Sequence, residues 1–406
     1  MKRIIFTMLS MLYAAYMYAD KTFTVSGVNY STDEVEHDGY FYATVTGLTS
    51  YPSDLVIPAE LAADAIGLSL PAKVTTIRYS AFSSKTGLTS VSLPHTITNI
   101  GDWAFGNSME LTRIEVDAQN EYYMSENGVL YDKYQSMLVC YPPAKEGSSF
   151  TLPGTVTIIF NNAFVNCPLT SVTLPDGLLI IGVFAFGECE NLTSINLPEG
   201  LVAILDKAFY GSSLTSISFP ASLSTLGYIP FSHCLKLTSF DVSEENEHYS
   251  SIDGVLYNKL GTHLLFYPLN RQETSFTTPD GVTHIESGAF EYCTGLNSLI
   301  ISDGVTNIGG GAFYSCSGLT YVSIANSVTN IGASAFGECT NLKNIVVSWS
   351  IPLNITATDV FKNVMFSSCI LHVPIGTKEA YKAANIWKNF NIIRSYYRKE
   401  APTDIR

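Results

Sequence analysis

The sequence predicts a mainly β solenoid, because one pattern recurs along most of the chain at steps of 22 or 23 residues. The stretch Leu88–Phe105 (LTSVSLPHTITNIGDWAF) is repeated as Leu296–Phe313 (LNSLIISDGVTNIGGGAF) and as Leu319–Phe336 (LTYVSIANSVTNIGASAF). Each copy has a leucine-led run with alternating apolar residues, then a short β-branched run, and then an Ala-Phe pair. Self-similarity at a period of about 20–29 residues, with leucine in this spacing, is the signature of a leucine-rich repeat solenoid.

One phenylalanine per repeat counts the turns of this solenoid, and it follows alanine except at Phe231, after Pro230, and at Phe361, after Val360. It recurs at steps of 22 or 23 residues, apart from two steps of 59 and a last step of 25. We therefore expect a right-handed leucine-rich repeat solenoid of about ten turns over residues 73–365. The counted residues are Phe82, Phe105, Phe164, Phe186, Phe209, Phe231, Phe290, Phe313, Phe336 and Phe361.

The two steps of 59 residues contain the same insertion, once at Asn120–Pro142 and again, 126 residues later, at Asn246–Pro268. In each copy a tight-turn dipeptide separates two β-type runs, Asn-Gly at 127–128 and Asp-Gly at 253–254. Such dipeptides favour two-residue hairpin turns. We therefore expect each insertion to form a hairpin that extends the wall of the solenoid.

Both ends of the chain depart from the repeat. Residues 20–72 alternate as short strands such as Tyr40–Val45, and an atypical first unit is what a solenoid needs to cover its open hydrophobic end. We expect them to form a β N-terminal cap. Residues 366–406 are expected to form a short α/β C-terminal cap and a tail. Their amphipathic segment Lys378–Ile386 predicts a helix, with Thr377 as its N-cap.

The first 19 residues read as a secretory signal peptide. Lys2 and Arg3 form a basic start, Ile4–Tyr18 is apolar, and Ala19 is the expected residue before cleavage. The apolar run is short for a membrane span. We therefore expect a mature chain, from about Asp20, that is exported without insertion into a membrane. Its expected location is secreted or associated with the cell surface.

Composition narrows the classes of partner. Charged residues make up 14% and hydrophobic residues 46% of the chain, which suffices for a long core and argues against disorder. The formal net charge of −14 would repel phosphate backbones and anionic membrane surfaces. Nucleic acid is therefore not an expected partner.

Six of the eight cysteines occupy the same repeat position, three residues after the phenylalanine. An exported chain with eight cysteines suggests disulfides. However, neighbouring turns would place these side chains side by side, with Cβ vectors that do not point toward each other. We therefore expect a ladder of buried, unpaired thiols. The six are Cys167, Cys189, Cys234, Cys293, Cys316 and Cys339.

Motifs of catalysis and of metal binding are not found in the sequence. The seven histidines are scattered, and the chain has no G-x-S-x-G elbow, P-loop or H-E-x-x-H motif. No C-x-x-C pair is present to hold zinc. We therefore expect neither an enzyme nor a cofactor or metal site.

The repeats resemble the BspA-like leucine-rich repeats of bacterial surface proteins. The resemblance rests on L-T-S-[VI]-x-L-P, V-T-x-I-G, A-F-x-x-C and D-G-V-L-Y, and on the run Cys369–Tyr381 followed by Trp387. It covers nearly all of Lys21–Arg394. The resemblance implies an exported, non-enzymatic β-rich solenoid from a family associated with adhesion to host proteins or to other cells.

The outward strand positions of the expected concave face change in character along the chain. Serine and threonine dominate the middle, whereas the C-terminal third gains Ile300, Tyr321 and Val346, with Trp349 just beyond. Tyrosine and tryptophan dominate the energetics of many interfaces. We predict that these four residues form a docking surface. In the alternative interpretation, the serines and threonines are simply tolerated at exposed strand positions.

The leading functional hypothesis is an exported binding or adhesion protein that docks an extracellular protein, from a host or from another cell surface. A second hypothesis is a glycan-binding surface protein that uses Tyr321 and Trp349 as sugar platforms. A third is a structural component of the cell envelope.

Overall fold

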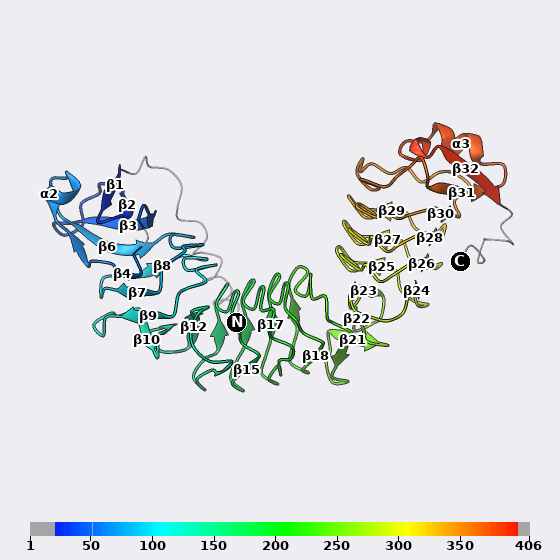
Figure 1. The fold of residues 1–406 in the computed structure, drawn as a ribbon. Helices are drawn as coiled ribbons and strands as arrows, with labels where there is room; N and C mark the ends of the chain where they lie inside the picture. The colour runs from blue at the N-terminus through cyan, green and yellow to red at the C-terminus, as the bar shows by residue number, and fades with distance from the viewer. Residues whose placement is uncertain (1–20, 51, 397–406) are drawn as a thin grey trace. The chain divides into compact units, whose positions relative to one another are not determined.

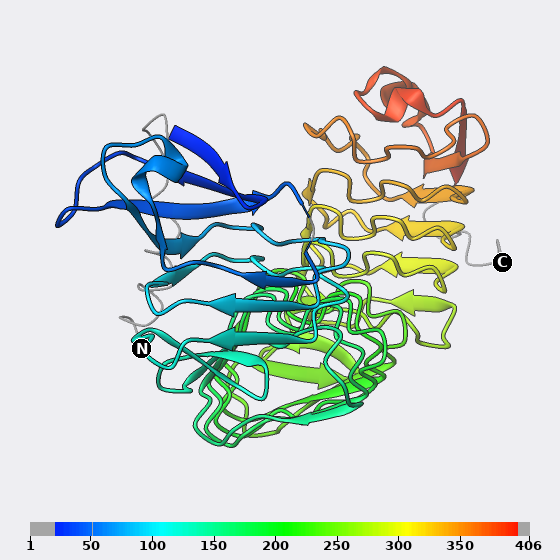
Figure 2. The same cartoon turned by 60° about the vertical axis from the view of Figure 1, so that its left-hand side comes forward.

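The computed structural model describes residues 21–50 and 52–396. The chain divides into two compact units, Met1–Glu146 and Gly147–Arg406. The predicted signal peptide, residues 1–19, lies outside the described residues. Each unit is a stack of coils that carry short strands (Figures 1 and 2). Within the described residues, no helix has the length and apolar character that a membrane span requires.

The first unit begins with a small sheet that does not belong to the repeats. Strands β1 (Lys21–Val25), β2 (Val28–Thr32) and β3 (Phe41–Leu48) pair antiparallel in that order. β3 then pairs in parallel with β6 (Ala72–Ile77), which introduces the parallel stacking of the repeats. The short elements β5 (Glu60–Leu61) and α2 (Ala63–Ile66) lie between them in the chain. The strands predicted in this region are therefore confirmed.

In each later coil, the leucine-led run and the β-branched run lie in two different parallel sheets, which we call the front sheet and the back sheet. In the first unit, the front sheet contains β4 (Asp54–Val56), β7 (Ser90–Leu93) and β9 (Arg113–Val116). The back sheet pairs β6 with β8 (Asn99–Ile100). Apolar residues of both sheets point inward, so the core runs between them.

Each insertion folds as an antiparallel meander. The first contains β10 (Tyr123–Glu126), β11 (Val129–Asp132) and β12 (Met137–Cys140). In the second, β21 (Tyr249–Ile252), β22 (Val255–Asn258) and β23 (His263–Phe266) pair in the same way. At 127–128 the two turn residues have φ of 50° and 78°, and at 253–254 they have φ of 49° and 75°. Two positive φ angles in a two-residue loop match the hairpin turn that Asn-Gly and Asp-Gly favour.

The second unit contains the longer front sheet. It is built in three sections, of which the last has six strands in register. Residues 192–198 hold the place of a front strand without forming one. The front strands are β13 (Ser149–Thr151), β15 (Ser171–Thr173), β18 (Ser216–Phe219), β20 (Ser239–Val242), β24 (Ser275–Thr277), β26 (Ser298–Ile301), β28 (Tyr321–Ile324), β30 (Asn344–Val347), β31 (Ile370–Pro374) and β32 (Ile392–Tyr396).

The back sheet of the second unit is made of strands of two residues each, besides β23. Their short length follows from the short β-branched run in each repeat. They are β14 (Ile158–Ile159), β16 (Ile180–Ile181), β17 (Ala203–Ile204), β19 (Thr225–Leu226), β25 (His284–Ile285), β27 (Asn307–Ile308) and β29 (Asn330–Ile331).

The structure has about 14 turns, whereas the count of Ala-Phe pairs gave about ten. The coils that begin with β9, β20, β31 and β32 have no Ala-Phe pair of their own, so the count missed them. In the coil that begins with β20, Tyr267 takes the place of the phenylalanine. Its ring stacks on Phe290 with 4.6 Å between the ring centroids.

A ladder of stacked rings fills the core of the second unit. Consecutive centroids from Phe290 through Phe313 and Phe336 to Phe361 are 4.9, 5.1 and 5.6 Å apart. This spacing follows from coils that repeat at about the interstrand distance of a sheet, ~4.8 Å. The single phenylalanine of each repeat therefore packs mainly against its own equivalents.

The cysteine ladder lies next to these rings. All eight cysteines are buried and unbridged. Four of the thiols donate a hydrogen bond to the carbonyl oxygen of a phenylalanine in the preceding coil, at 3.1–3.2 Å. The donor–acceptor pairs are Cys189–Phe164, Cys234–Phe209, Cys316–Phe290 and Cys339–Phe313. The side chains thus lie where the repeat position predicts.

The C-terminal segment adds α3 (Lys378–Ala383) and the 3₁₀ turn η1 (Trp387–Asn389) to the end of the stack. Trp387 is fully buried, and its indole Nε1 donates to the carbonyl oxygen of Leu353 at 2.8 Å. The predicted N-cap is wrong in its chemistry. Thr377 precedes α3, but its hydroxyl donates to the carbonyl oxygen of Pro374 and does not accept from a helix N–H.

Candidate binding surface

The last six front strands of the second unit, from β24 to β32, place their outward side chains in two parallel rows. In-register pairing aligns the first and the third residue of each strand across the sheet. The first row is Ser275, Ser298, Tyr321, Asn344, Ile370 and Ile392. The second row is Thr277, Ile300, Ser323, Val346, His372 and Arg394.

Two of the four residues predicted to form the docking surface, Val346 and Trp349, are buried, with exposed fractions of 0% and 6%. The other two are accessible, since Ile300 is 36% exposed and Tyr321 is half-buried. The predicted apolar patch is therefore smaller than the sequence suggested, and Val346 and Trp349 do not contribute to it.

Val346 is buried because the front sheet continues beyond β30. Its neighbours in the second row are Ser323 on one side and the buried His372 on the other. From β32, the hydroxyl of Tyr396 reaches back to donate to the carbonyl oxygen of Val347 at 3.0 Å. Val346 thus lies inside the sheet and not at its edge, and Tyr396 ties β32 back to the backbone beside it.

Burial also determines the protonation state of His372, the histidine in this row. His372 Nε2 lies 3.0 Å from the side-chain oxygen of Asn344. Its burial, and then the nearby charge of Arg394, lower the pKa of His372 below its usual value. The imidazole is therefore neutral near pH 7.

Trp349 is a core residue that joins the last repeats to the C-terminal segment. Its indole Nε1 donates to the carbonyl oxygen of Val328 at 2.9 Å, and its own carbonyl oxygen accepts from the hydroxyl of Tyr381. The ring of Trp387 lies 5.8 Å away, centroid to centroid. The ring is thus not available as a platform for a ligand.

The apolar groups that remain accessible on this sheet are few and do not form one continuous patch. Ile300 lies on the strand next to Tyr321, and Ile392, which is 37% exposed, is in the row of Tyr321. Around them lie the hydroxyl and amide side chains of Ser298, Ser323 and Asn344 in the same two rows. The surface that can contact a partner is therefore polar, with isolated apolar groups.

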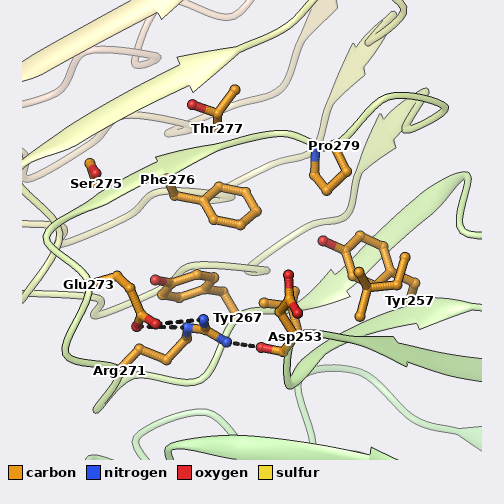
Figure 3. Close-up of a pocket in the computed structure, with 11 residues that line it drawn as sticks. Asp253, Tyr257, Tyr267, Arg271, Glu273, Ser275, Phe276, Thr277 and Pro279 are labelled. Carbon is orange, nitrogen blue, oxygen red and sulfur yellow. Dashed lines mark hydrogen bonds and ion pairs between the residues drawn. The ribbon is translucent and has the colours of Figure 1, made fainter.

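The second insertion interrupts the front sheet and leaves a pocket beside the interruption. Among the described strands, β20 pairs only with β18, and β24 pairs only with β26. The turn of the insertion closes on β20, where the carbonyl oxygen of Gly254 accepts from the N–H of Phe240 at 2.9 Å. Next to this turn is a cavity of about 200 Å³ (Figure 3).

Charged and aromatic side chains line this pocket. In Figure 3, Asp253 lies on the side of the pocket toward Tyr257, and the hydroxyl of Tyr267 points away from it, toward Glu273. Arg271 donates to the carboxylate of Glu273 at 2.9 and 3.1 Å and to the backbone oxygen of Asp253. The carboxylate of Asp253 itself has no hydrogen bond or ion pair within the described residues.

Tyr267 is the most constrained polar group of the pocket. It is 1% exposed, and its hydroxyl has no hydrogen-bond partner among the described residues. Burial raises the pKa of Tyr267 to about 12. The ring is held between the stacked ring of Phe290 and the guanidinium of Arg271, whose centre is 5.6 Å from the ring centroid. Such an unpaired hydroxyl in a protein interior is unfavourable unless a ligand or water satisfies it.

The first insertion carries a related set of residues with a different charge. Lys145 Nζ donates to the backbone oxygen of Asn127, as Arg271 does to that of Asp253. Tyr131 and Tyr141 stand 126 residues before Tyr257 and Tyr267. The first copy therefore has a neutral amide where the second has a carboxylate. The sequence shows this difference, Asn-Gly at 127–128 against Asp-Gly at 253–254, but it does not show the pocket beside the second turn.

Within the described part of the chain, no group of three or more His, Cys, Asp or Glu side chains could hold a metal ion. The chemistry that the surface and the pocket offer is that of non-covalent recognition. It consists of hydroxyl and amide hydrogen bonding, a few accessible apolar groups, and one unpaired carboxylate beside aromatic rings.

Comparison with known proteins identifies the repeat. The BspA type leucine rich repeat region matches in six copies, over residues 64–130, 145–253 and 265–385. A leucine rich cell surface protein from Faecalibacterium prausnitzii is 25% identical, with a TM-score of 0.55 over 94% of this chain and 97% of its own. The pneumococcal vaccine antigen PcpA is 20% identical, with a TM-score of 0.50 over 93% and 98% of the two chains.

None of the curated proteins matches the sequence. The two solved structures share the solenoid fold, and the repeat match extends over most of the chain, including both units. The chain belongs to the BspA-type leucine-rich repeat family.

Proposed function

We propose that the protein is a non-enzymatic binding protein, exported to the cell surface or beyond it, that docks an extracellular protein partner on the front sheet of the second unit. Three findings support this proposal. The family is one of repeat scaffolds, and the similar protein from Faecalibacterium prausnitzii is described as a cell surface protein. The sequence of residues 1–19, with its basic start and apolar run, supports export.

The observation that carries the proposal is the arrangement of Ile300 and Tyr321 on adjacent strands of a rigid sheet. Six hydrogen-bonded strands fix the backbone of this surface, so little conformational entropy is lost when a partner binds. A half-buried tyrosine among small polar residues suits a protein interface, since its ring offers area and its hydroxyl offers a hydrogen bond.

The second hypothesis, glycan binding through aromatic platforms, loses support on this sheet. A sugar platform needs an accessible ring face, and the ring of Trp349 is buried against Trp387. Tyr321 alone would offer a single, half-buried ring. The protein hypothesis therefore accounts better for this surface.

The test is binding to a panel of purified extracellular and cell-surface proteins, measured by biolayer interferometry with the immobilised mature chain. Once a partner is identified, Tyr321→Ser should weaken binding, because serine already occupies outward positions of this sheet and should leave the fold intact. Tyr228→Ser, at a tyrosine that is 55% exposed outside the front sheet, is the matched control. A protein that binds no member of the panel and instead forms only homotypic assemblies would support the structural-component hypothesis.

A further inference from the structure

We propose that the pocket beside the turn at 253–254 binds a primary ammonium group, the side-chain terminus of a lysine that the protein partner inserts. This inference rests on the proposed function, because the partner supplies the lysine. It adds a specific anchor point to a surface that is otherwise mostly polar.

The balance of charge in the pocket favours a cation. Three charged residues line it, Asp253, Arg271 and Glu273, and together they carry a net charge of −1. The guanidinium of Arg271 is committed to Glu273 and to a backbone oxygen. The carboxylate of Asp253 is therefore the charge that remains without a partner, and it lies at the side of the pocket toward Tyr257 (Figure 3).

The aromatic walls suit an ammonium group as well. Phe276 is only partly buried, although its register equivalent on the next strand, Leu299, is fully buried. The ring of Phe276 is thus accessible from the pocket, and a ring face attracts a cation through its quadrupole. An ammonium has three N–H donors and no acceptor. The carboxylate of Asp253 is the acceptor that can receive them (Figure 3).

The size of the pocket selects a single side chain. Sites for complete small molecules usually have volumes of about 300–1,000 Å³. This cavity, at about 200 Å³, is smaller than that range. It is suited to the end of one side chain that belongs to a larger ligand.

The position of the pocket connects it to the proposed docking surface. Ser275 and Thr277 of β24 line the pocket and also begin the two outward rows of the front sheet. Thr277 is the register partner of Ile300, and Ser298 separates Ser275 from Tyr321 in the first row. A protein that covers Ile300 and Tyr321 would therefore extend to the mouth of the pocket. We commit to a protein lysine for this reason, rather than to the amine of a free metabolite or of an amino sugar.

The test uses Nα-acetyl-lysine methylamide as a probe, titrated into the mature chain and followed by NMR of the labelled aromatic residues. Nα,Nε-diacetyl-lysine methylamide, which has no charge, is the matched negative probe. We expect binding with a dissociation constant of about 1 mM, the range of a single weak contact, for the charged probe alone. The affinity should fall as salt increases.

Asp253→Asn tests the role of the carboxylate without disturbing the turn. Asn127 occupies the equivalent position of the first insertion with φ of 50°, nearly the φ of 49° at Asp253. We expect Asp253→Asn to weaken binding of the charged probe about tenfold, the effect of a hydrogen bond to a charged group. Asp303→Asn, at another exposed Asp-Gly pair, should leave the affinity unchanged.

Three results would overturn the inference: no binding of the charged probe, equal binding of the two probes, or equal affinity of the parent and Asp253→Asn. Binding of methyl glucoside or methyl glucosaminide, at an affinity above that of the lysine probe, would also overturn it in favour of a sugar. The outcome is separate from that of the proposed function. If the probe binds as expected while Tyr321→Ser leaves partner binding unchanged, only the proposed docking surface fails.

Discussion

Replacing Phe313 by alanine should destabilise the second unit more than any change at the surface. The ring of Phe313 is 0% exposed and is stacked between two others, with centroids 4.9 Å from Phe290 and 5.1 Å from Phe336. The N–H of Phe313 donates a backbone hydrogen bond to the oxygen of Ala335 at 2.8 Å, which fixes the spacing between neighbouring coils at this point. The neighbouring rings therefore cannot move together to fill the space that the substitution leaves.

The expected loss is about 4 kcal/mol of unfolding free energy. Replacement of a buried phenylalanine by alanine costs about 3–5 kcal/mol, and the higher values occur where the surroundings do not collapse. This range already contains the ring–ring contacts, so no further energy is added for them. Phe313→Leu keeps most of the apolar volume and should cost less than about 1.5 kcal/mol.

Urea denaturation followed by far-ultraviolet circular dichroism measures these differences. Tyr228→Ala, at an exposed position, should change the free energy of unfolding by no more than about 0.5 kcal/mol. A loss below about 1 kcal/mol for Phe313→Ala would refute the argument that the ring ladder is a principal source of stability. Equal losses for the alanine and leucine variants would show that ring shape, and not buried volume, decides the effect.

Two further predictions concern buried polar groups. Cys316→Ser should be tolerated better than Cys316→Val, because Ser108 already donates to a phenylalanine oxygen at the equivalent position. Valine cannot donate this hydrogen bond, and its extra volume should cost about 1–3 kcal/mol of unfolding free energy. Thermal unfolding of both variants tests this, and a more stable valine variant would contradict it. Because the pKa of His372 is lowered in the folded protein, the unfolded chain takes up a proton at a higher pH than the folded chain does. The free energy of unfolding should therefore decrease as pH falls through the usual histidine pKa of about 6.5. His372→Gln should reduce that loss between pH 7.5 and 5.5, and an unchanged pH dependence of unfolding would show that the burial of His372 is unimportant.

The repeat architecture could be predicted from the sequence because each rule behind it acts within one coil. The alternation in Ser90–Leu93, the ring at the Ala-Phe position and the dipeptides at 127–128 and 253–254 all specify local geometry. Stacking then follows from repetition, since identical coils bury each other's apolar faces. The turn count fell short where Tyr267 replaced the phenylalanine that served as the marker.

The functional surface was predicted less well because exposure depends on contacts between residues far apart in the chain. Strand phase correctly assigns Val346 to the outward side, but it cannot show that β31 and β32 extend the sheet beyond it or that Tyr396 bonds back to the carbonyl oxygen of Val347. Trp349 follows the last repeat strand, and only the docking of Tyr381 and Trp387 shows that it is buried.

The pocket has a different origin. It exists where the second insertion separates β20 from β24, and its lining comes from one stretch of the chain, residues 252–279. No single motif marks such a site. The change from Asn127 to Asp253 between two otherwise similar insertions is the sequence signal that points to it.

The most direct test of the docking surface is the ratio of two dissociation constants for the same protein partner, that of Tyr321→Ser to that of Tyr228→Ser. Loss of an interface hot spot costs about 2 kcal/mol or more, which corresponds to about thirtyfold in affinity. We therefore predict a ratio of about 30, with unchanged unfolding of both variants. A ratio near 1 would contradict the assignment of the front sheet of the second unit as the binding surface.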